Sequence, residues 1–260
     1  MKRRVTLAAK IASALPPGVS RPLLRLKDYA IAARYAGTGR DCPVCGRSSR
    51  RFRPFGNPPR EQARCAHCTA LERHRFVWLF LQRKTDFFDE RSRRMLHIAP
   101  ERCFAERFRR AIGDGYLSAD LTNRAAMERM DITDINYPDR TFDIIYCSHV
   151  LEHVFDDRQA LRELRRVLKE DGWALLQVPD SAERTMEDPA IATPAERLAA
   201  YGHEEHFRLY GEDFAERARE EGFRVSVVKV RDLALADAEI ETMGLGTATG
   251  NIYYCTKRSP

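Results

Sequence analysis

From about residue 93 onward, short apolar segments alternate with segments of helical periodicity, and this alternation constrains the fold more than any other feature of the chain. Apolar runs typical of buried strands occupy residues 95–99, 116–120, 142–147, 173–178, 223–230 and 251–257. Helical periodicity occupies residues 102–112, a segment that begins at Asp156-Asp157 and ends at Asp171-Gly172, and residues 212–221. Such alternation is typical of a parallel sheet covered on both faces, so we expect an α/β domain over residues 93–260.

Four of the seven cysteines form two C-x-x-C pairs, Cys42 with Cys45 and Cys65 with Cys68, separated by 19 residues. Each pair can direct both thiolates to one side of a turn, and two such turns can surround a tetrahedral zinc ion. Residues 39–74 have few core side chains of their own, so zinc would supply folding energy. We expect a zinc-ribbon-like module here with a structural Zn²⁺, followed by a helical linker over residues 75–92.

Two other uses of these cysteines remain alternatives. A redox pair needs only one C-x-x-C, at the start of a helix, and a disulfide framework is typical of secreted chains. His67 or His74 could replace one thiolate, although four cysteines already complete a tetrahedral site. Because a closed site has no open position, we expect its role to be structural or in recognition.

Positive charge is concentrated near the N-terminus. Residues 1–60 contain 14 lysines and arginines and two acidic residues, a net charge of +12, whereas the 260-residue chain has a formal charge of +6. We predict a basic amphipathic arm over residues 1–38, with a helix near residues 22–36 and a signal peptide as the weaker alternative. Such an arm attracts phosphate on nucleic acid or on anionic lipid.

The chain has no apolar run of the length that spans a bilayer, and its cysteine usage fits a reducing compartment. We therefore expect a cytoplasmic protein. Peripheral contact with the anionic inner face of the membrane, through the N-terminal arm, is the alternative that this charge distribution leaves open. The sequence does not indicate an oligomeric state.

Three acidic residues stand where parallel strands are expected to end. Glu101 follows the first strand, Asp120 ends the second, and Asp131 lies between the second strand and Phe142. Ligands of open α/β sheets bind at the carboxyl ends of the strands. An acid about 20 residues past the first turn can accept both ribose hydroxyls of a nucleotide-like cofactor, and Asp120 stands 21 residues after Ala99. Asp131 could accept from an adenine amine.

At this point residues 93–230 resemble a class I S-adenosylmethionine-dependent methyltransferase of the small-molecule type, similar to methyltransferase type 11. The resemblance is carried by D-I-T-D at residues 131–134, by F-D-I-I-Y-C-S-H-V-L-E-H at residues 142–153, and by L-R-R-V-L-K-E-D-G-W at residues 164–173. It implies a Rossmann-like, doubly wound, mostly parallel sheet of seven strands with an antiparallel last hairpin. It also implies S-adenosylmethionine as the methyl donor.

The whole chain also resembles a subgroup of bacterial methyltransferases with an N-terminal zinc-ribbon-like segment. Besides the two C-x-x-C pairs, this resemblance is carried by H-I-A-P-E at residues 97–101 and by Y-G-H-E-E-H-F-R-L-Y at residues 201–210. The resemblance implies the following cofactor-binding residues: His97, Ala99, Pro100, Glu101, Asp120, Leu121, Asp131, Ile132, Cys147 and Ser148.

The first cofactor loop departs from the pattern of that family. The usual acidic-x-Gly-x-Gly-x-Gly is replaced by His97, Ala99, Glu101 and Cys103. Because glycine permits positive φ and close backbone approach, its absence predicts a different loop path around the methionine portion of the cofactor. Ala99 is still small enough for close approach, and Glu101 could meet the ammonium group of the donor.

The sulfonium of the donor is already activated, so catalysis needs mainly in-line positioning, plus a base if an alcohol must lose its proton. His149 stands at the carboxyl end of the fourth strand of the family's sheet and is the candidate base. A hydrogen-bonding role without proton transfer is the alternative. Residues expected to bind an anionic or sugar-like acceptor are His153, His203, His206, Arg208 and Tyr210, with bracing of the substrate-facing loop as the alternative for His206 and Arg208.

His149-Val-Leu-Glu152-His153 also matches H-x-x-E-H, an inverted zinc-peptidase pattern in which two histidines bind zinc and the glutamate acts as base. That chemistry needs a long helix with both histidines facing a cleft. Here His149 directly follows a strand, and a capped helix begins only after Phe155. The pattern therefore favours the methyltransferase interpretation.

Two classes of methyl acceptor remain open. The arginines between the cysteines favour RNA as the acceptor, with Phe52 and Phe55 as groups that could stack on bases. Against RNA, the chain has neither an Asn/Asp-Pro-Pro-Tyr motif nor a Pro-Cys nucleophile. We favour a small-molecule or glycan-type acceptor, methylated on oxygen or nitrogen. A non-catalytic binding module that has lost the cofactor is the third hypothesis, and Asp120 and Asp131 argue against it.

Overall fold

The computed structural model describes residue 26 and residues 28–257, so most of the predicted arm lies outside the described residues. The chain divides into two units. One extends to Arg75 and includes Ala236–Gly246, and the other contains Phe76–Leu235 and the chain from Thr247 onward. The larger unit thus begins at Phe76, earlier than the predicted domain of residues 93–260, and the internal segment Ala236–Gly246 of that predicted domain belongs to the smaller unit.

The smaller unit contains two antiparallel hairpins. β1 (Arg40–Cys42) pairs with β2 (Arg47–Ser49), and β3 (Arg53–Phe55) pairs with β4 (Arg60–Arg64). The first C-x-x-C begins at the end of β1, and the second follows β4 directly. The helix predicted near residues 22–36 is present over residues 28–34.

Arg75 holds the late segment in the smaller unit. Its side chain is fully buried and lies over the ring of Phe52, with the guanidinium carbon 4.1 Å from the ring centroid. The guanidinium donates to four backbone carbonyls, those of Ala63, Ala70, Met243 and Gly244. Met243 is the last residue of α8 (Asp237–Met243), and Gly244 follows it. One arginine therefore connects the end of this helix to the second hairpin. Phe52 is consequently buried and cannot stack on a base, which corrects its predicted role.

The larger unit is built on the seven-stranded sheet that the sequence predicted. Its strand order is β10-β11-β9-β8-β5-β6-β7, and only β11 is antiparallel to its neighbours. The strands are β5 (Met95–Ile98), β6 (Tyr116–Asp120), β7 (Glu128–Arg129), β8 (Phe142–Ser148), β9 (Leu168–Gln177), β10 (Arg224–Val228) and β11 (Ile252–Thr256). The chain builds outward from β5 in one direction and then, from β8, in the other. The doubly wound α/β fold is thereby confirmed.

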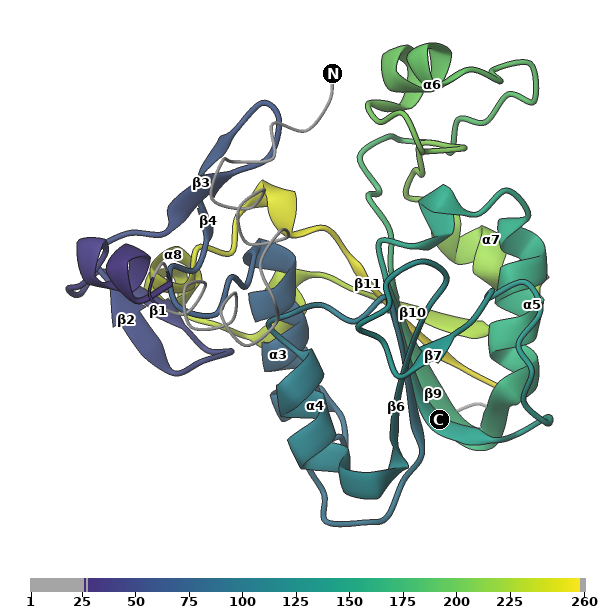
Figure 1. Cartoon of the computed structure of the whole chain (residues 1–260), viewed down its shortest axis with the longest axis horizontal. Helices are drawn as coiled ribbons and strands as arrows, with labels where there is room; N and C mark the ends of the chain where they lie inside the picture. The colour runs from purple at the N-terminus through teal and green to yellow at the C-terminus, as the bar shows by residue number, and fades with distance from the viewer. Residues whose placement is uncertain (1–25, 27, 258–260) are drawn as a thin grey trace. The chain divides into compact units, whose positions relative to one another are not determined.

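Helices cover both faces of this sheet. α3 (Glu72–Lys84) and α4 (Ala105–Ile112) lie on one face, and α5 (Asp157–Val167) and α7 (Phe214–Glu220) lie on the other (Figure 1). The segment predicted as a helical linker, residues 75–92, contains the rest of α3 and a turn. Its Trp78 stacks on Phe104 and Phe108 of the larger unit, so it forms part of the core.

Two sequence interpretations of local structure were wrong. Asp171-Gly172 does not end a helix, because α5 ends at Val167 and both residues lie within β9. The register of β8 against β9 shifts at this point, and a Cβ on Gly172 would lie 2.6 Å from the carbonyl oxygen of Asp143. The Asp-Gly pair thus permits a strand irregularity. Strand β7 was not expected, because its two residues are exposed and charged and have no apolar signal.

None of the helices in the described part of the chain is long and apolar enough to span a membrane.

Candidate active site

A cavity of about 590 Å³ opens at the carboxyl ends of the parallel strands. This is where ligands of doubly wound sheets bind, because the loops after the strands diverge at the point where the strand order reverses, here between β5 and β8. The strand-end loops contribute Ile98, Ala99, Asp120, Leu121, Thr122, Met130, Asp131, Ile132, His149, Val150, His153 and Val154. A later segment contributes Pro194, Arg197, Glu204, Glu205 and Phe207.

Asp120 and Asp131 both line this cavity, and each is fixed by its own turn. Oδ1 of Asp120 accepts hydrogen bonds from the backbone amides of Thr122 (2.8 Å) and Asn123 (2.7 Å). Oδ1 of Asp131 accepts from the amide and the hydroxyl of Thr133, at 2.9 and 2.7 Å. Both carboxylates accept these hydrogen bonds through Oδ1. The turns therefore orient the two side chains without using Oδ2.

The loop after β5 has a residue with positive φ although it lacks the glycines of the family pattern. Ala99 has a φ of 48°, in the left-handed region that glycine usually occupies, and its amide donates to the carbonyl of Ala119 at 2.8 Å. A left-handed conformation costs an alanine about 1–2 kcal/mol. Ala99 therefore adopts the positive φ that a glycine would allow, and the different loop path around the cofactor stays a prediction.

His97 is not among the residues that line the cavity, so its cofactor contact stays a prediction. The side chain is fully buried; Nδ1 is 2.9 Å from the hydroxyl of Tyr116, and Nε2 is 2.9 Å from Oε2 of Glu101. The other oxygen of Glu101 accepts from the hydroxyl of Tyr146 at 3.2 Å. His97 thus positions Glu101, and neither residue is part of the cavity lining.

Three further residues of the predicted cofactor set also lie outside the lining. They are Pro100, Cys147 and Ser148. Cys147 and Ser148 end β8 and are buried, and burial raises the pKa of the Cys147 thiol. The hydroxyl of Ser148 donates to the side-chain oxygen of Gln177 at 3.3 Å. The structure thus brings together Ala99, Asp120, Leu121, Asp131 and Ile132 of the set.

His149 lines the cavity in a strained conformation. Its φ is 54°, and its amide donates to the carbonyl of Gln177 at 2.9 Å. Nδ1 lies 3.3 Å from Oε1 of Glu152, whose side chain is 1% exposed. Burial alone would raise the pKa of Glu152, but the hydrogen bond and charge of His149 and the charge of His153 lower it below its usual value. An ionised Glu152 favours the imidazole tautomer with hydrogen on Nδ1 and the lone pair on Nε2.

Arg208 and Tyr210, both predicted to bind the acceptor, are buried and do not line the cavity; the contacts of Arg208 match the alternative of bracing the loop. Arg208 is buried and donates to the carbonyls of Leu151 (3.1 Å), Val154 (2.6 Å) and Phe155 (2.7 Å). Its Nε also donates to Glu187 at 2.8 Å. This arginine therefore fixes the loop after β8.

Tyr210, two residues after Arg208, belongs to the same buried network of hydrogen bonds and ion pairs. It is fully buried, and its hydroxyl donates to Oδ2 of Asp157 at 2.5 Å. Arg217 donates to Oδ1 of that carboxylate at 2.7 Å and to Glu187 at 2.9 Å. Tyr210 and Arg217 thereby satisfy the buried aspartate at the start of α5.

The other three predicted acceptor ligands lie together beside the cavity. The ring centroids of His153 and His206 are 4.6 Å apart, those of His203 and His206 are 4.7 Å apart, and those of His153 and His203 are 5.4 Å apart. Burial lowers the pKa of His206 to about 4, so this imidazole is neutral at neutral pH. The H-x-x-E-H peptidase geometry is not formed, since residues 151–153 make a single 3-10 turn and His149 is not part of this cluster.

Comparison with known proteins identifies the domain that carries this cavity. Residues 92–176 match the family model described as a methyltransferase domain. The chain carries a methyltransferase domain that includes these residues. The matched residues contain both β5 and β8, and so the point where the strand order reverses.

Individual relatives agree with this assignment. The uncharacterized methyltransferase YcgJ of Bacillus subtilis is 52% identical over 40 residues, which are 15% of this chain and about a sixth (16%) of YcgJ. An S-adenosylmethionine-dependent methyltransferase of Mesorhizobium loti has a TM-score of 0.50 at 15% identity, covering 69% of this chain and 97% of that one. The structure of YcgJ has a TM-score of 0.44 at 17% identity, with 69% and 93% covered. The Mesorhizobium structure shows the shared fold.

Several lining residues of the methyltransferase domain were not predicted. Thr122, Val150 and Val154 stand next to predicted positions, so extending each strand-end motif by a few residues would have found them. Arg197 and Phe207 belong to the segment after β9, and the Arg197 guanidinium lies over the Phe207 ring at 4.1 Å. Phe207 lies within the motif of residues 201–210 and next to predicted positions, whereas no local sequence signal marks Arg197, which only the fold brings to the cavity.

The four cysteines of the C-x-x-C pairs converge in the smaller unit. Cys42 Sγ is 3.6 Å from Cys68 Sγ, and Cys45 Sγ is 3.8 Å from Cys65 Sγ. Zinc–sulfur bonds of about 2.3 Å in a tetrahedron separate the sulfurs by about 3.8 Å, so these thiols fit a zinc ion. All four are free thiols, and they form no disulfide.

Neither histidine near the cysteines takes the place of a thiolate. Nδ1 of His74 accepts from the amide of Leu71 at 3.0 Å, and Nε2 of His67 lies 3.2 Å from the carbonyl oxygen of Ser48. The amide of Gly46 donates to the carbonyl of Cys42 at 2.8 Å, which closes the first turn. The residues present therefore match a four-thiolate site.

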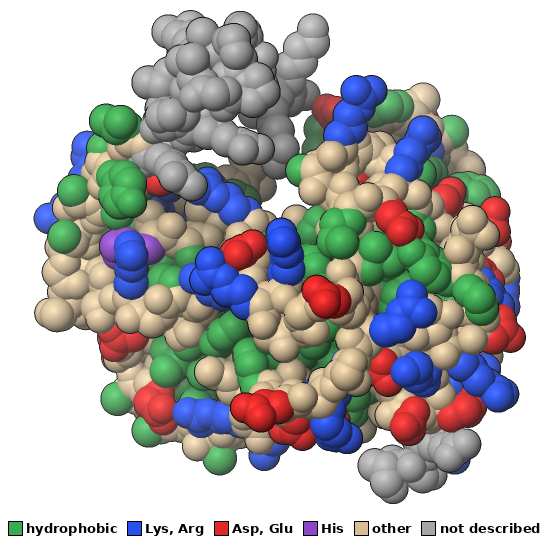
Figure 2. Space-filling view, turned by 60° about the horizontal axis from the view of Figure 1, so that its bottom comes forward, with side chains coloured by type: hydrophobic (Ala, Val, Ile, Leu, Met, Phe, Trp, Pro, Cys, Tyr) green, Lys and Arg blue, Asp and Glu red, His purple; other side chains and the backbone are tan. Residues whose placement is uncertain are grey.

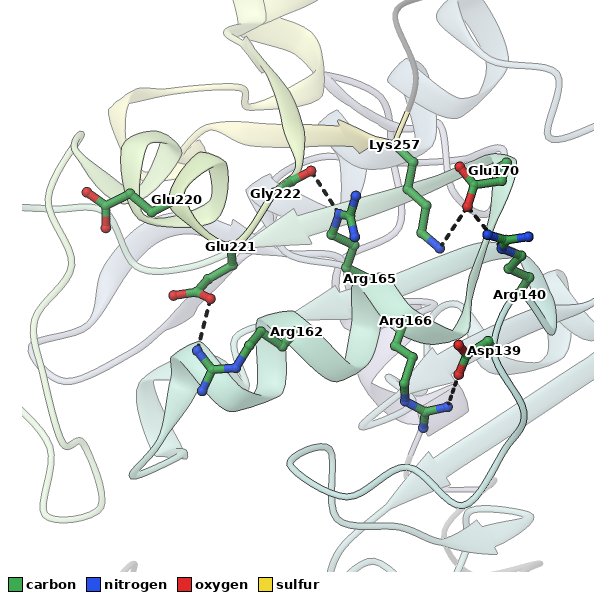
Figure 3. Close-up of a pocket in the computed structure, with 10 residues that line it drawn as sticks. All are labelled: Asp139, Arg140, Arg162, Arg165, Arg166, Glu170, Glu220, Glu221, Gly222 and Lys257. Atoms are coloured by element: carbon green, nitrogen blue, oxygen red, sulfur yellow. Dashed lines mark hydrogen bonds and ion pairs between the residues drawn. The ribbon is translucent and has the colours of Figure 1, made fainter.

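A second cavity of about 550 Å³ in the methyltransferase domain is lined mostly by charged side chains (Figure 3). Four of its five cations are paired with acids: Arg162 with Glu221, Arg166 with Asp139, and Arg140 and Lys257 both with Glu170. The fifth, Arg165, donates to the carbonyl of Gly222 at 2.8 Å. Acidic and basic side chains are likewise interspersed over much of the face shown in Figure 2. Because its charges neutralise one another, this cavity is a weaker candidate for a ligand site than the one at the strand ends.

Proposed function

We propose that this chain transfers the methyl group of S-adenosylmethionine to the oxygen or nitrogen of a small-molecule or glycan-type acceptor. The observation that carries the proposal is the joint position of Asp120 and Asp131 in one cavity at the reversal of strand order. In this arrangement Asp120 accepts the ribose hydroxyls of the donor, and Asp131 accepts from the adenine amine. Ile98, Leu121 and Ile132 supply apolar walls for the adenosyl group.

His149 acts as the general base in this proposal. When the acceptor is an alcohol, its proton passes to Nε2 of His149, and the oxygen attacks the methyl carbon of the sulfonium. The carbon–sulfur bond breaks with its electron pair on sulfur, which gives S-adenosylhomocysteine, the methyl ether and an imidazolium. Glu152 supports this step because it stabilises the imidazolium from the Nδ1 side, at 3.3 Å.

The acceptor part of the cavity favours a polar ligand of small size. Arg197, Glu204 and Glu205 line the cavity from the segment after β9, and His153 lines it from the loop after β8. A cavity of about 590 Å³ falls in the range of small-molecule sites. Charged side chains around one end fit an anionic or sugar-like group better than an apolar one.

Calorimetric titration with S-adenosylmethionine tests the donor site. Asp120→Asn and Asp131→Asn each remove one charge and retain an oxygen for the turn, so both variants should fold and bind the donor at least tenfold more weakly. The matched control is Asp156→Asn, since Asp156 also accepts from a backbone amide, that of Gln159 at 2.9 Å, outside the cavity. Equal donor affinity in all four proteins would contradict the proposed pocket.

Transfer of a labelled methyl group into fractions of a cell extract tests the acceptor class. Label should enter the small-molecule or glycan fraction and should resist ribonuclease. Loss of label after ribonuclease would instead support RNA as the acceptor. Absence of transfer in every fraction, together with absence of donor binding, would support the non-catalytic binding module.

RNA remains the second candidate because arginines of the smaller unit are exposed. Arg47, Arg50, Arg51 and Arg60 all reach solvent, although Arg60 pairs with Glu72 at 3.3 Å. If these arginines bind RNA phosphates, RNA affinity should fall steeply as salt concentration rises. The burial of Phe52 removes one of the two stacking groups on which this hypothesis depended.

A further inference from the structure

Three histidines form a cluster that neither the donor site nor the proposed base requires. His153 lies in the loop after β8, and His203 and His206 lie in the segment after α6 (Pro194–Tyr201). One ring nitrogen of each lies within 4.8 Å of one nitrogen of each of the others. His153 lines the cavity, as do Glu204 and Glu205 between the other two, so the cluster stands at the cavity rim.

The backbone around this cluster is held in place by buried contacts. The amide of Phe207 donates to the carbonyl of Glu152 at 2.8 Å, which joins the two segments next to His206 and His153. Arg208 fastens the same loop through the carbonyls of Leu151 and Val154. The three imidazoles therefore converge because their backbones are fixed, rather than by chance contact of mobile surface side chains.

The polar atoms beside the cluster call for a cation. Glu152 is 1% exposed, and its Oε2 has no hydrogen-bond partner among the described residues. Nδ1 of His206 is buried and also has no hydrogen-bond partner among the described residues. A buried polar atom without a partner calls for an explanation such as a bound ion, and a metal ligated by this nitrogen supplies one.

We propose that His153, His203 and His206 bind one divalent transition-metal ion, zinc or a metal of similar preference, at the rim of the cavity. Imidazole suits zinc, iron, nickel and copper and does not suit magnesium or calcium. Three protein ligands leave the fourth tetrahedral position open, in contrast with the closed site of the four thiolates. Nδ1 of His203 accepts from the amide of Glu205 at 3.1 Å, so this nitrogen has a lone pair, and a metal there replaces that bond.

The role of the metal rests on the proposed methyl transfer. An oxygen of the acceptor takes the open position, which fixes its orientation toward the donor. If that oxygen belongs to a hydroxyl, coordination makes its proton more acidic, and the proton passes to His149 as before. The substrate class that this site selects is a small molecule or glycan whose methylated hydroxyl oxygen, or a phosphate or carboxylate oxygen next to the methylated atom, binds the metal.

Cobalt titration of the full-length protein, purified with zinc in the thiolate site, tests the proposal. We expect one further equivalent of Co²⁺ to bind, with cobalt absorption bands that have no thiolate charge-transfer component. His153→Asn, His203→Asn and His206→Asn should each weaken this binding at least tenfold. Glu204→Gln, on the same loop but outside the cluster, should leave it unchanged.

Two results would overturn the proposal: no additional cobalt in the wild-type protein, or additional cobalt that all three histidine variants retain. Azide added to the cobalt form should shift its spectrum by entering the open position, and an unchanged spectrum would contradict the acceptor role. Donor affinity of His203→Asn should equal that of the wild type. Failure of donor binding would therefore remove the proposed function while leaving the cobalt result to decide the metal site.

Discussion

At the scale of the residue, Ala99 shows how the methyltransferase domain departs from the usual glycine loop. Its φ of 48° lies where glycine is unstrained, so Ala99→Gly relieves strain but adds freedom to the unfolded chain. We expect a net gain of about 0.5–1 kcal/mol in unfolding free energy, measured by denaturant titration. The control Ala105→Gly, at the start of α4, should destabilise by a similar amount. Equal losses in both variants would contradict a strained Ala99.

His149 carries a second prediction at this scale. His149→Ala should lower the rate of methyl transfer about 100-fold or more and leave donor affinity unchanged, since a positioned base contributes roughly 10²–10⁴-fold. Glu152→Gln keeps the shape of the buried side chain but removes the charge that stabilises the imidazolium, so it should show a smaller loss. The rate of labelled methyl transfer into the acceptor fraction measures both losses. Near-normal transfer by His149→Ala would leave only a packing role.

Sequence motifs identified several residues that line the cavity at the strand ends, but they could not judge burial. Asp120 and Asp131 were identifiable because acids at strand ends have a defined place in the fold. The sequence could not show that His97, unlike these two acids, is buried. Its contacts with Tyr116 and Glu101 form only when the sheet forms. The same holds for the burial of Arg208, whose partners are backbone carbonyls more than 50 positions away.

At the scale of the element, Arg208 joins the loop after β8 to the segment that carries two of the clustered histidines. Arg208→Leu leaves Glu187 and three carbonyls without this donor, so we expect a loss of roughly 3–5 kcal/mol in unfolding free energy. Arg208→Lys keeps the charge and should lose less. Hydrogen exchange of residues 150–155 should accelerate in both variants. Unchanged exchange in Arg208→Leu would show that the loop is held by other contacts.

Helices and strands with clear apolar periodicity were predictable, and irregular ones were not. β6 matches its predicted range of residues 116–120, because its side chains are mostly buried. The Asp-Gly pair in β9 has the composition of a helix stop, and only the register shift against β8 shows its use. α8 has no buried residue of its own, so nothing in its sequence indicated that it belongs to the smaller unit.

At the scale of the whole molecule, the four-thiolate cluster and the proposed donor cavity lie in different units. Every lining residue of the cavity falls within Phe76–Leu235, and the four cysteines precede Arg75. Metal analysis should find one tightly held zinc per chain, which Cys65→Ser removes. Since zinc supplies much of the folding energy of such a module, residues 39–75 of this variant should become sensitive to protease. Donor affinity should persist, and its collapse would contradict the independence of the two sites.

The central claim is that the cavity after β5, β6 and β7 holds the adenosyl group of the donor through two acidic side chains. A crystal structure of the protein with S-adenosylhomocysteine tests this claim most directly. The account predicts that the ribose hydroxyls lie within hydrogen-bond distance of Asp120 and the adenine amine near Asp131. A ligand bound elsewhere, or bound here with both carboxylates turned away from it, would contradict the account.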